Sequence, residues 1–425
     1  MPHNSRLVSA WAFLAGFFLW LPAVGLSFLP LPLQPMDILV PAGAPLIALQ
    51  WRSLGAGTGM IALTFIASVC LSFVVVGGEA LALLHALVLA LPFLLLVSIV
   101  ARLPDARSFF LVGFLLASAA SVGLFFAQLA IGAEALDFRT NAAFSLPPQY
   151  LRGFAFFPEV STYATHSIIA LAVCLCVLLH PNGSKRWRGA LKLLACALAA
   201  ALLFSRSTSF LVITPMLCAL AAGQARKLDS RSILTLLLVS GICVAILIVF
   251  FNTFYTDRLE TASATRSASM RFASVVAGLS PLWRGETFGV GLGENHEILR
   301  RAFDIGRALD LRFGQLPKGV NSQIIARIFE EGWPAVLNIV VGMTFLLRGV
   351  LKRSADPVVA ALMVIAAGSF LTALLVTGYR GIYTNWIWLA VPAALLAAQQ
   401  PVRRSTTPNV RPRIRRSNQS VARRA

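Results

Sequence analysis

Charged residues are scarce in this chain, and the few that it has are unbalanced. Charged side chains make up 12% of the 425 residues, with 36 basic against 17 acidic, while 58% of the residues are hydrophobic and the mean hydropathy is +0.79. A soluble domain usually contains about a quarter charged residues. The composition therefore argues against a soluble protein. Apolar stretches of about 20 residues recur along the chain, which indicates an all-α polytopic membrane protein.

Other features are also scarce or missing. The first apolar run, 7–28, lacks a small-residue cleavage site, so we expect a retained helix rather than a removed signal peptide. The six cysteines all fall within apolar runs, which argues against a disulfide framework and favours small buried hydrophobes. They are Cys70, Cys174, Cys176, Cys196, Cys218 and Cys243. We find no internal repeat, and the segments predicted to face outward contain no Asp-x-Asp pair.

What the chain does have is a series of about twelve apolar segments that we predict to be transmembrane helices. The second, seventh and eighth are short. The segments are 7–28, 36–50, 57–76, 80–101, 109–131, 162–180, 190–204, 210–223, 233–251, 333–347, 358–376 and 383–398. They divide the chain into helices one to nine (1–251), a large outer loop with amphipathic helices (252–332), helices ten to twelve (333–400) and a basic tail (401–425).

The distribution of charge predicts the orientation. With the N-terminus in the cytoplasm, the cytoplasmic segments hold 22 of the 36 basic residues, eight of them arginines after position 401, and only three acidic residues. This bias is the positive-inside rule, and it places both termini in the cytoplasm and the 252–332 loop outside. The sequence pI of about 11.0 then reflects topology and contact with anionic lipid rather than nucleic acid.

Arginines on the outer face run against this bias and therefore call for an explanation. A guanidinium group can bind phosphate oxygens bidentately, so converging arginines suit a pyrophosphate ligand. The alternative is that each one pairs with an outer acid, such as Asp257, Glu260 or Glu159, or reaches lipid headgroups. The candidate arginines are Arg152, Arg206, Arg258, Arg266, Arg271 and Arg380.

The outer loop contains two recognisable patterns. Gly289, Gly291 and Gly293 alternate with other residues, which predicts turns with positive φ or a close backbone approach, without the βαβ context of a dinucleotide site. Residues 294–313 have apolar side chains at helical spacing, which predicts an amphipathic helix at the outer interface. A short helix is expected to follow, with Asn321 or Ser322 as its N-cap, and Ser322 is the preferred candidate.

Four short sequence patterns, taken in their order along the chain, resemble those of the O-antigen ligase and O-antigen polymerase superfamily. They are Arg-Gly-Phe-Ala-Phe-Phe-Pro-Glu at 152–159, Ser-Arg-Ser at 205–207, Gly-x-Gly-x-Gly at 289–293 and a short helix ending in Glu-x-Gly at 330–332. The resemblance covers about residues 149–340. It implies a GT-C-like integral glycosyltransferase of the bacterial inner membrane, which takes a glycan from undecaprenyl pyrophosphate on the periplasmic face without a metal or other cofactor.

By the same resemblance, Arg206 and Arg271 would hold the pyrophosphate, with Arg152 as a further candidate. The partners implied are the undecaprenyl-pyrophosphate-linked glycan and membrane lipid, and a chain-length regulator and a flippase are further candidates. No nucleic acid is expected. Among the activities of this superfamily, we predict polymerisation of repeat units into O-antigen or exopolysaccharide. The alternative is ligation of the glycan to lipid A core in lipopolysaccharide.

The chain departs from the ligase pattern at one position. Ligases have His-Asn before the Glu-x-Gly helix, whereas here Asn321 and Ser322, or Val320 with a shift of one, take that place. The absent histidine favours polymerase over ligase. His296, Glu294 and Glu159 are the candidate general bases in its place, and Asn321 and Glu330 belong to the loop pattern.

A transporter or flippase for polysaccharide or lipid is the competing class. Transporters often have repeated halves and ionisable groups at mid-membrane depth. Among the N-terminal segments only His85 is plainly ionisable at that depth. A long outer loop also fits an enzyme better than a transporter.

Overall fold

The computed structural model shows a helical membrane protein. It describes residues 3–22, 24, 33–138, 153–157, 160–183, 185–205, 207, 209–225, 262–309, 322–375 and 383–398. Within these residues the chain is helical and forms no β-strand, apart from one isolated parallel bridge between Gly78 and Leu292. Seven of the described helices are long and apolar enough to cross a membrane. The prediction of an all-α membrane protein is therefore confirmed.

The first half of the chain supplies most of the bundle. Its elements are α1 (His3–Phe18), α2 (Pro35–Leu49), η1 (Trp51–Ser53), α3 (Ala56–Val75), α4 (Ala80–Leu84), the π-helical turn η2 (His85–Ala90), α5 (Leu91–Arg102), α6 (Pro104–Ile131), α7 (Val160–Leu179), α8 (Arg188–Ser205) and α9 (Ser209–Ala225). The elements after residue 261 are α11 (Ala262–Leu279), α12 (Pro281–Arg284), α13 (Asn295–Ala308), α14 (Gln323–Glu331), α15 (Trp333–Leu351), α16 (Pro357–Leu375), η4 (Tyr383–Trp386) and α17 (Ile387–Ala398).

Ten of the twelve predicted segments coincide with helices of the structure to within a few residues, and the ninth, 233–251, lies outside the described residues. The prediction for the first segment was wrong at its end, because α1 stops at Phe18 and not at residue 28. Trp20 and Leu21 donate to the carbonyls three residues earlier, so the helix tightens before it ends. Pro22 follows, and proline disfavours helical geometry at the residue before it.

Local sequence sets the ends of the longest helix. Pro104 occupies the first turn of α6, where its missing N–H costs nothing, and Gly132 ends the helix with a φ of 111°. The 28 residues between them span about 42 Å, more than the roughly 30 Å hydrocarbon core of a bilayer. We therefore expect α6 to cross the membrane and to project beyond it.

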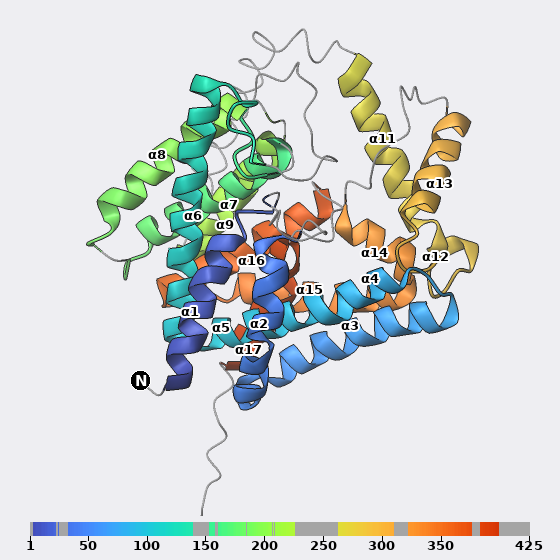
Figure 1. Cartoon of the computed structure of the whole chain (residues 1–425), viewed down its shortest axis with the longest axis horizontal. Coiled ribbons are helices and arrows are strands. Elements are labelled where there is room, and N and C mark those ends of the chain that lie inside the picture. Colours follow the sequence, from blue (N-terminus) through green and yellow to red (C-terminus); the bar gives the residue numbers. More distant parts are fainter. Residues whose placement is uncertain are drawn as a thin grey trace, which may run out of the picture.

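The helices differ in depth within the bundle. α1 lies along α6, α17 packs on α5 and α15, and α7 and α16 lie in contact at the centre (Figure 1). In α7 and α16, 72% of the most apolar window is buried, against 28% in α15. The outer helices expose large apolar side chains instead, among them Leu63, Val74 and Leu351. Such exposure is costly in water and favourable in lipid, as expected for membrane spans.

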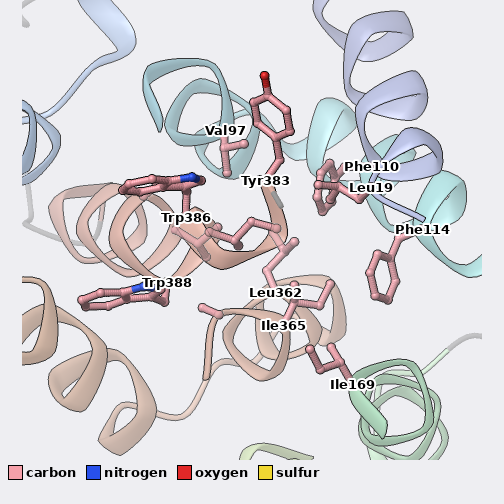
Figure 2. Packing of buried hydrophobic residues seen from close by; sticks show 14 of the residues in the cluster. Leu19, Val97, Phe110, Phe114, Ile169, Leu362, Ile365, Tyr383, Trp386 and Trp388 are labelled. Carbon is pink, nitrogen blue, oxygen red and sulfur yellow. The ribbon is translucent and has the colours of Figure 1, made fainter. Parts of the chain in front are cut away.

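The core centres on the chain turn that enters α17. Figure 2 shows Tyr383, Trp386 and Trp388 beside Leu362 and Ile365 of α16. The Tyr383 hydroxyl donates to Asp37 Oδ1 at 2.6 Å, which ties η4 to the first turn of α2. The neighbouring Thr384 hydroxyl lies 2.9 Å from the His166 ring of α7. These polar contacts fix how the three elements η4, α2 and α7 meet.

Candidate functional site at the outer segment

The helices α11, α12 and α13 with their connections (residues 262–309) form a small unit beside the bundle, here called the outer segment after the topology predicted from the sequence. Figure 1 shows α11 and α13 side by side above α14. Their apolar side chains share a core with Phe329 of α14, which is fully buried. The remaining buried members are Ala273, Ala277, Ile298 and Ala302. The outer segment is therefore seated on α14 rather than held only by its chain connections.

The amphipathic helix predicted at 294–313 is present but shorter, as α13 ends at Ala308. Ile298 and Ala302 are buried, as their spacing predicts, while Leu309 lies past the helix and is exposed. The apolar face of α13 packs on α11. The expectation that this face lies on the membrane interface is therefore wrong for Ile298 and Ala302, because α11 covers them.

Arg301 connects the helices and turns of the outer segment through its hydrogen bonds. Its guanidinium binds Glu286 through two hydrogen bonds of 2.8 and 2.9 Å, Glu297 at 3.0 Å and the Ser280 hydroxyl at 3.0 Å. Its Cζ also lies 5.2 Å from the centre of the Phe329 ring. The hydrogen bonds to Glu286, with a smaller contribution from Glu297, raise the pKa of Arg301. Arg301 is therefore a structural cation with its donors in use.

The alternating glycines form a connection between the outer segment and two parts of the bundle. Val290 N donates to Phe329 O at 3.0 Å and Gly291 N to Glu330 O at 3.2 Å, at the end of α14. Leu292 N donates to Gly77 O at 3.2 Å, and Glu79 N donates back to Leu292 O at 2.8 Å. Residues 289–293, here the glycine stretch, therefore thread between α14 and the turn from α3 to α4.

Glycine is required at Gly289 for two separate reasons. Its φ is +79°, a backbone conformation that costs an L-residue with a side chain about 1–2 kcal/mol. A Cβ there would also overlap the Glu330 carbonyl. Gly291 and Gly293 have positive φ as well. The prediction of positive φ and close backbone approach is confirmed, and the glycines serve docking between backbones.

A buried ion pair within α14 connects this helix to its neighbours. Arg327 donates to both carboxylate oxygens of Glu331, at 2.9 and 2.8 Å, and to Asn338 Oδ1 at 3.0 Å. The Ser68 hydroxyl donates to the same carboxylate. The guanidinium carbon lies 5.1 Å from the centre of the Phe65 ring and 5.5 Å from that of Trp386. Helices α3, α14 and α15 and the element η4 thus meet around one arginine.

This pair was not predicted from the sequence, although a signal was present. Arg327 and Glu331 are four residues apart, the spacing that places an acid and a base together on one helix face. The strongly apolar residues between and before them indicated burial. Ser322 was correctly predicted as the N-cap of α14, because its hydroxyl accepts from Ile325 N at 3.3 Å.

The middle of the Arg-Gly-Phe-Ala-Phe-Phe-Pro-Glu pattern also has a structural role. Gln128 of α6 accepts from the backbone N–H groups of Phe154 and Ala155, at 2.8 and 2.7 Å, and donates to Ala155 O at 3.2 Å. The Phe157 ring lies 4.5 Å from the His166 ring and 5.7 Å from Trp20. The middle of the pattern therefore anchors the chain between α6 and α7.

An apolar cavity of about 210 Å³ adjoins this anchored stretch. Phe156 and Phe138 line it on one side, and Phe17 of α1 and Ala117 of α6 line it on the other. Its lining holds only apolar side chains, and it lies between two helices of the membrane bundle. A cavity of this kind suits a hydrocarbon chain rather than a sugar.

The predicted site residues have different outcomes. The structure brings together Gly289, Gly291, Gly293 and Glu330, the last of which is 1% exposed. Arg271 is exposed on α11, and Glu294 and His296 are exposed at the start of α13. Arg266 belongs to α11, but its side chain is outside the described part. The others, Arg152, Glu159, Arg206, Arg258, Asn321 and Arg380, lie outside the described residues.

Comparison with known proteins adds no identification. No protein-family model matches the chain, and no curated protein is significantly similar to it. The resemblance of the four patterns therefore remains an expectation from the sequence.

Proposed function

We propose that the chain is a metal-independent inverting glycosyltransferase of the bacterial inner membrane, which polymerises oligosaccharide repeat units carried on undecaprenyl pyrophosphate. On this proposal twelve spans form a GT-C-like fold, both termini are cytoplasmic and the outer segment covers a periplasmic reaction site. The observation that supports it most is the docking of the glycine stretch on the end of α14. Two elements of the family resemblance, far apart in the sequence, meet there as one structure.

The chemistry proposed for this site requires arginine. The hydroxyl oxygen of an acceptor glycan attacks the anomeric carbon of the donor, and the bond from that carbon to the pyrophosphate breaks. The pyrophosphate leaves with the electron pair, and guanidinium groups stabilise the charge that develops on it. Arg271 is exposed and available for this role. Arg206 and Arg152 are its proposed companions, with Arg258, Arg266 and Arg380 as further contacts.

The acceptor hydroxyl loses its proton to a general base. His296 and Glu294 are exposed at the start of α13, on the same outer segment as Arg271. Glu159 is the third candidate. The apolar cavity between α1 and α6 offers a place for part of the polyprenyl chain, close to the stretch that follows Arg152.

Complementation of a deletion strain tests the proposal. The strain receives wild-type protein, Arg271→Gln or the matched control Arg300→Gln, which removes another exposed arginine of the outer segment. Surface polysaccharide is resolved by length and by attachment, and the amount of each variant in the membrane is measured. We expect long chains with the wild type and the control. With Arg271→Gln, we expect roughly a hundredfold less polymer, the usual cost of removing one transition-state donor.

The other outcomes separate the alternatives. Single repeat units on their final carrier in the deletion strain support a polymerase. Long chains left on undecaprenyl pyrophosphate contradict it and indicate an O-antigen ligase. An unchanged profile contradicts both and favours a transporter or flippase. Normal polymer with Arg271→Gln contradicts the role of that arginine.

A further inference from the structure

A basic cavity lies at the opposite end of the bundle from the glycine stretch in the predicted topology. Its volume is about 410 Å³, and it is formed where α7 ends and α8 begins, next to the turn from α15 to α16. Hydrogen bonds hold the two turns together. The His180 ring lies 3.2 Å from Ser354 O, and Asn182 Nδ2 donates to Ala355 O at 3.0 Å. The cavity is therefore built by two segments remote in sequence.

The charge of this cavity is of one sign. Lys185, Arg188 and Arg353 line it, and its lining includes no carboxylate. Arg353 donates to Ala225 O at 2.8 Å, a contact that leaves its charge uncompensated. Asp356, which lies in the same turn, is paired with Arg107. Three cations without a carboxylate partner among the described residues create a positive potential that favours an anion.

Apart from His180, the other side chains of the lining are apolar, which points to an amphiphilic anion. Val177, Leu178 and Leu191 form this part of the wall. The cavity sits at the ends of two candidate membrane spans, and α8 projects at the edge of the bundle (Figure 1). Beside it, Trp187 is 59% exposed, with the Arg186 guanidinium 5.8 Å from the ring centre. An exposed tryptophan between basic residues is typical of the membrane–water interface.

We propose that this cavity binds the phosphate headgroup of an anionic phospholipid of the inner leaflet. The charge bias of the chain places this end of the bundle in the cytoplasm, where basic pockets between helices meet anionic lipid. The headgroup phosphate contacts Lys185, Arg188 and Arg353, and the glycerol and acyl chains lie along the apolar wall. The bound lipid links the turn from α7 to α8 with the turn from α15 to α16. This inference does not rest on the glycosyltransferase proposal.

The test uses the full-length protein in neutral detergent and measures two quantities. These are the shift of the thermal unfolding midpoint on adding phosphatidylglycerol and the lipid retained in native mass spectrometry. The variant is Lys185→Gln with Arg188→Gln. The matched control is Arg6→Gln with Arg52→Gln, which removes two exposed cations of the same predicted face outside the cavity. We expect phosphatidylglycerol to stabilise wild type and control, and to bind the variant roughly 30-fold more weakly.

Further arms make the result decisive. Lys185→Arg with Arg188→Lys retains both charges and is expected to keep the response, which separates loss of binding from loss of folding. Phosphatidylcholine and inorganic phosphate are expected to give no stabilisation. An equal response in variant and control overturns the proposal. Protection by inorganic phosphate alone also overturns it, because the site would then be one for free phosphate and not for lipid.

Discussion

The arginines of α14 and of the outer segment fall into two groups with different surroundings, one buried in contacts around α14 and one on the exposed surface of the outer segment. The side chain of Arg327 is 5% exposed and that of Arg301 is 10% exposed, and both use their donors within the protein. The side chain of Arg300 is 74% exposed, and Arg271 is also exposed. An arginine whose hydrogen bonds are already made cannot readily hold a phosphate. Exposed arginines such as Arg271 are therefore better ligand candidates than Arg301 and Arg327.

The largest effect is expected from breaking the buried pair. Arg327→Met leaves the Glu331 carboxylate buried without its cation, which should cost about 3–5 kcal/mol of stability. Unfolding of the purified protein, followed by fluorescence against temperature or denaturant, measures the loss. Arg300→Met is the matched control, with a change close to zero because its pair with Glu297 is exposed. Equal stability of the two variants would contradict the comparison.

A smaller effect is expected at the glycine stretch. Gly289→Ala meets both the cost of positive φ and the overlap with the Glu330 carbonyl, so we expect a loss of roughly 3 kcal/mol. Gly285→Ala isolates the first cost, because its φ is +78° and a Cβ there meets open space. Its loss should be about 1 kcal/mol. The same unfolding measurement checks both, and similar losses would show that docking on α14 adds nothing.

The smallest effect is expected at Arg301. Arg301→Gln removes the hydrogen bonds that join Glu286, Glu297 and Ser280 and should cost about 1–2 kcal/mol, mostly within the outer segment. Limited proteolysis should therefore cut residues 262–309 faster in this variant, while the membrane helices stay intact. Arg300→Gln serves again as control. Cleavage at the wild-type rate would show that Arg301 does not hold the unit together.

The sequence predicts the helices well because each depends on a local property. A run of apolar residues such as 57–76 must be helical in lipid, and α3 covers almost the same residues. The end of α1 is less predictable, since Leu19, Trp20 and Leu21 remain apolar after the helix has stopped. Apolar character continues there because these residues are needed in the core, where Trp20 packs on Phe114 and Phe157.

The candidate site is less predictable than the fold. Alternating glycines indicate close backbone approach, yet nothing in that pattern says that the partner is the end of α14. The sequence spacing suggests a pair for Arg301 and for Arg327, but only the fold shows that these two arginines are buried while Arg271 is exposed. Glu286 binds Arg301 and Asn338 binds Arg327, and only tertiary packing brings these partners close.

Phe329 imposes an order on the assembly of the protein. It completes the core of the outer segment, but it lies on α14, which follows that segment in the chain. Because synthesis runs from the N-terminus, α11, α12 and α13 are made before the Phe329 side chain that they enclose. The core of these helices requires Phe329 of α14, and the buried Arg327 of α14 binds Asn338 of α15. The core of the outer segment is therefore complete only once α14 has been made.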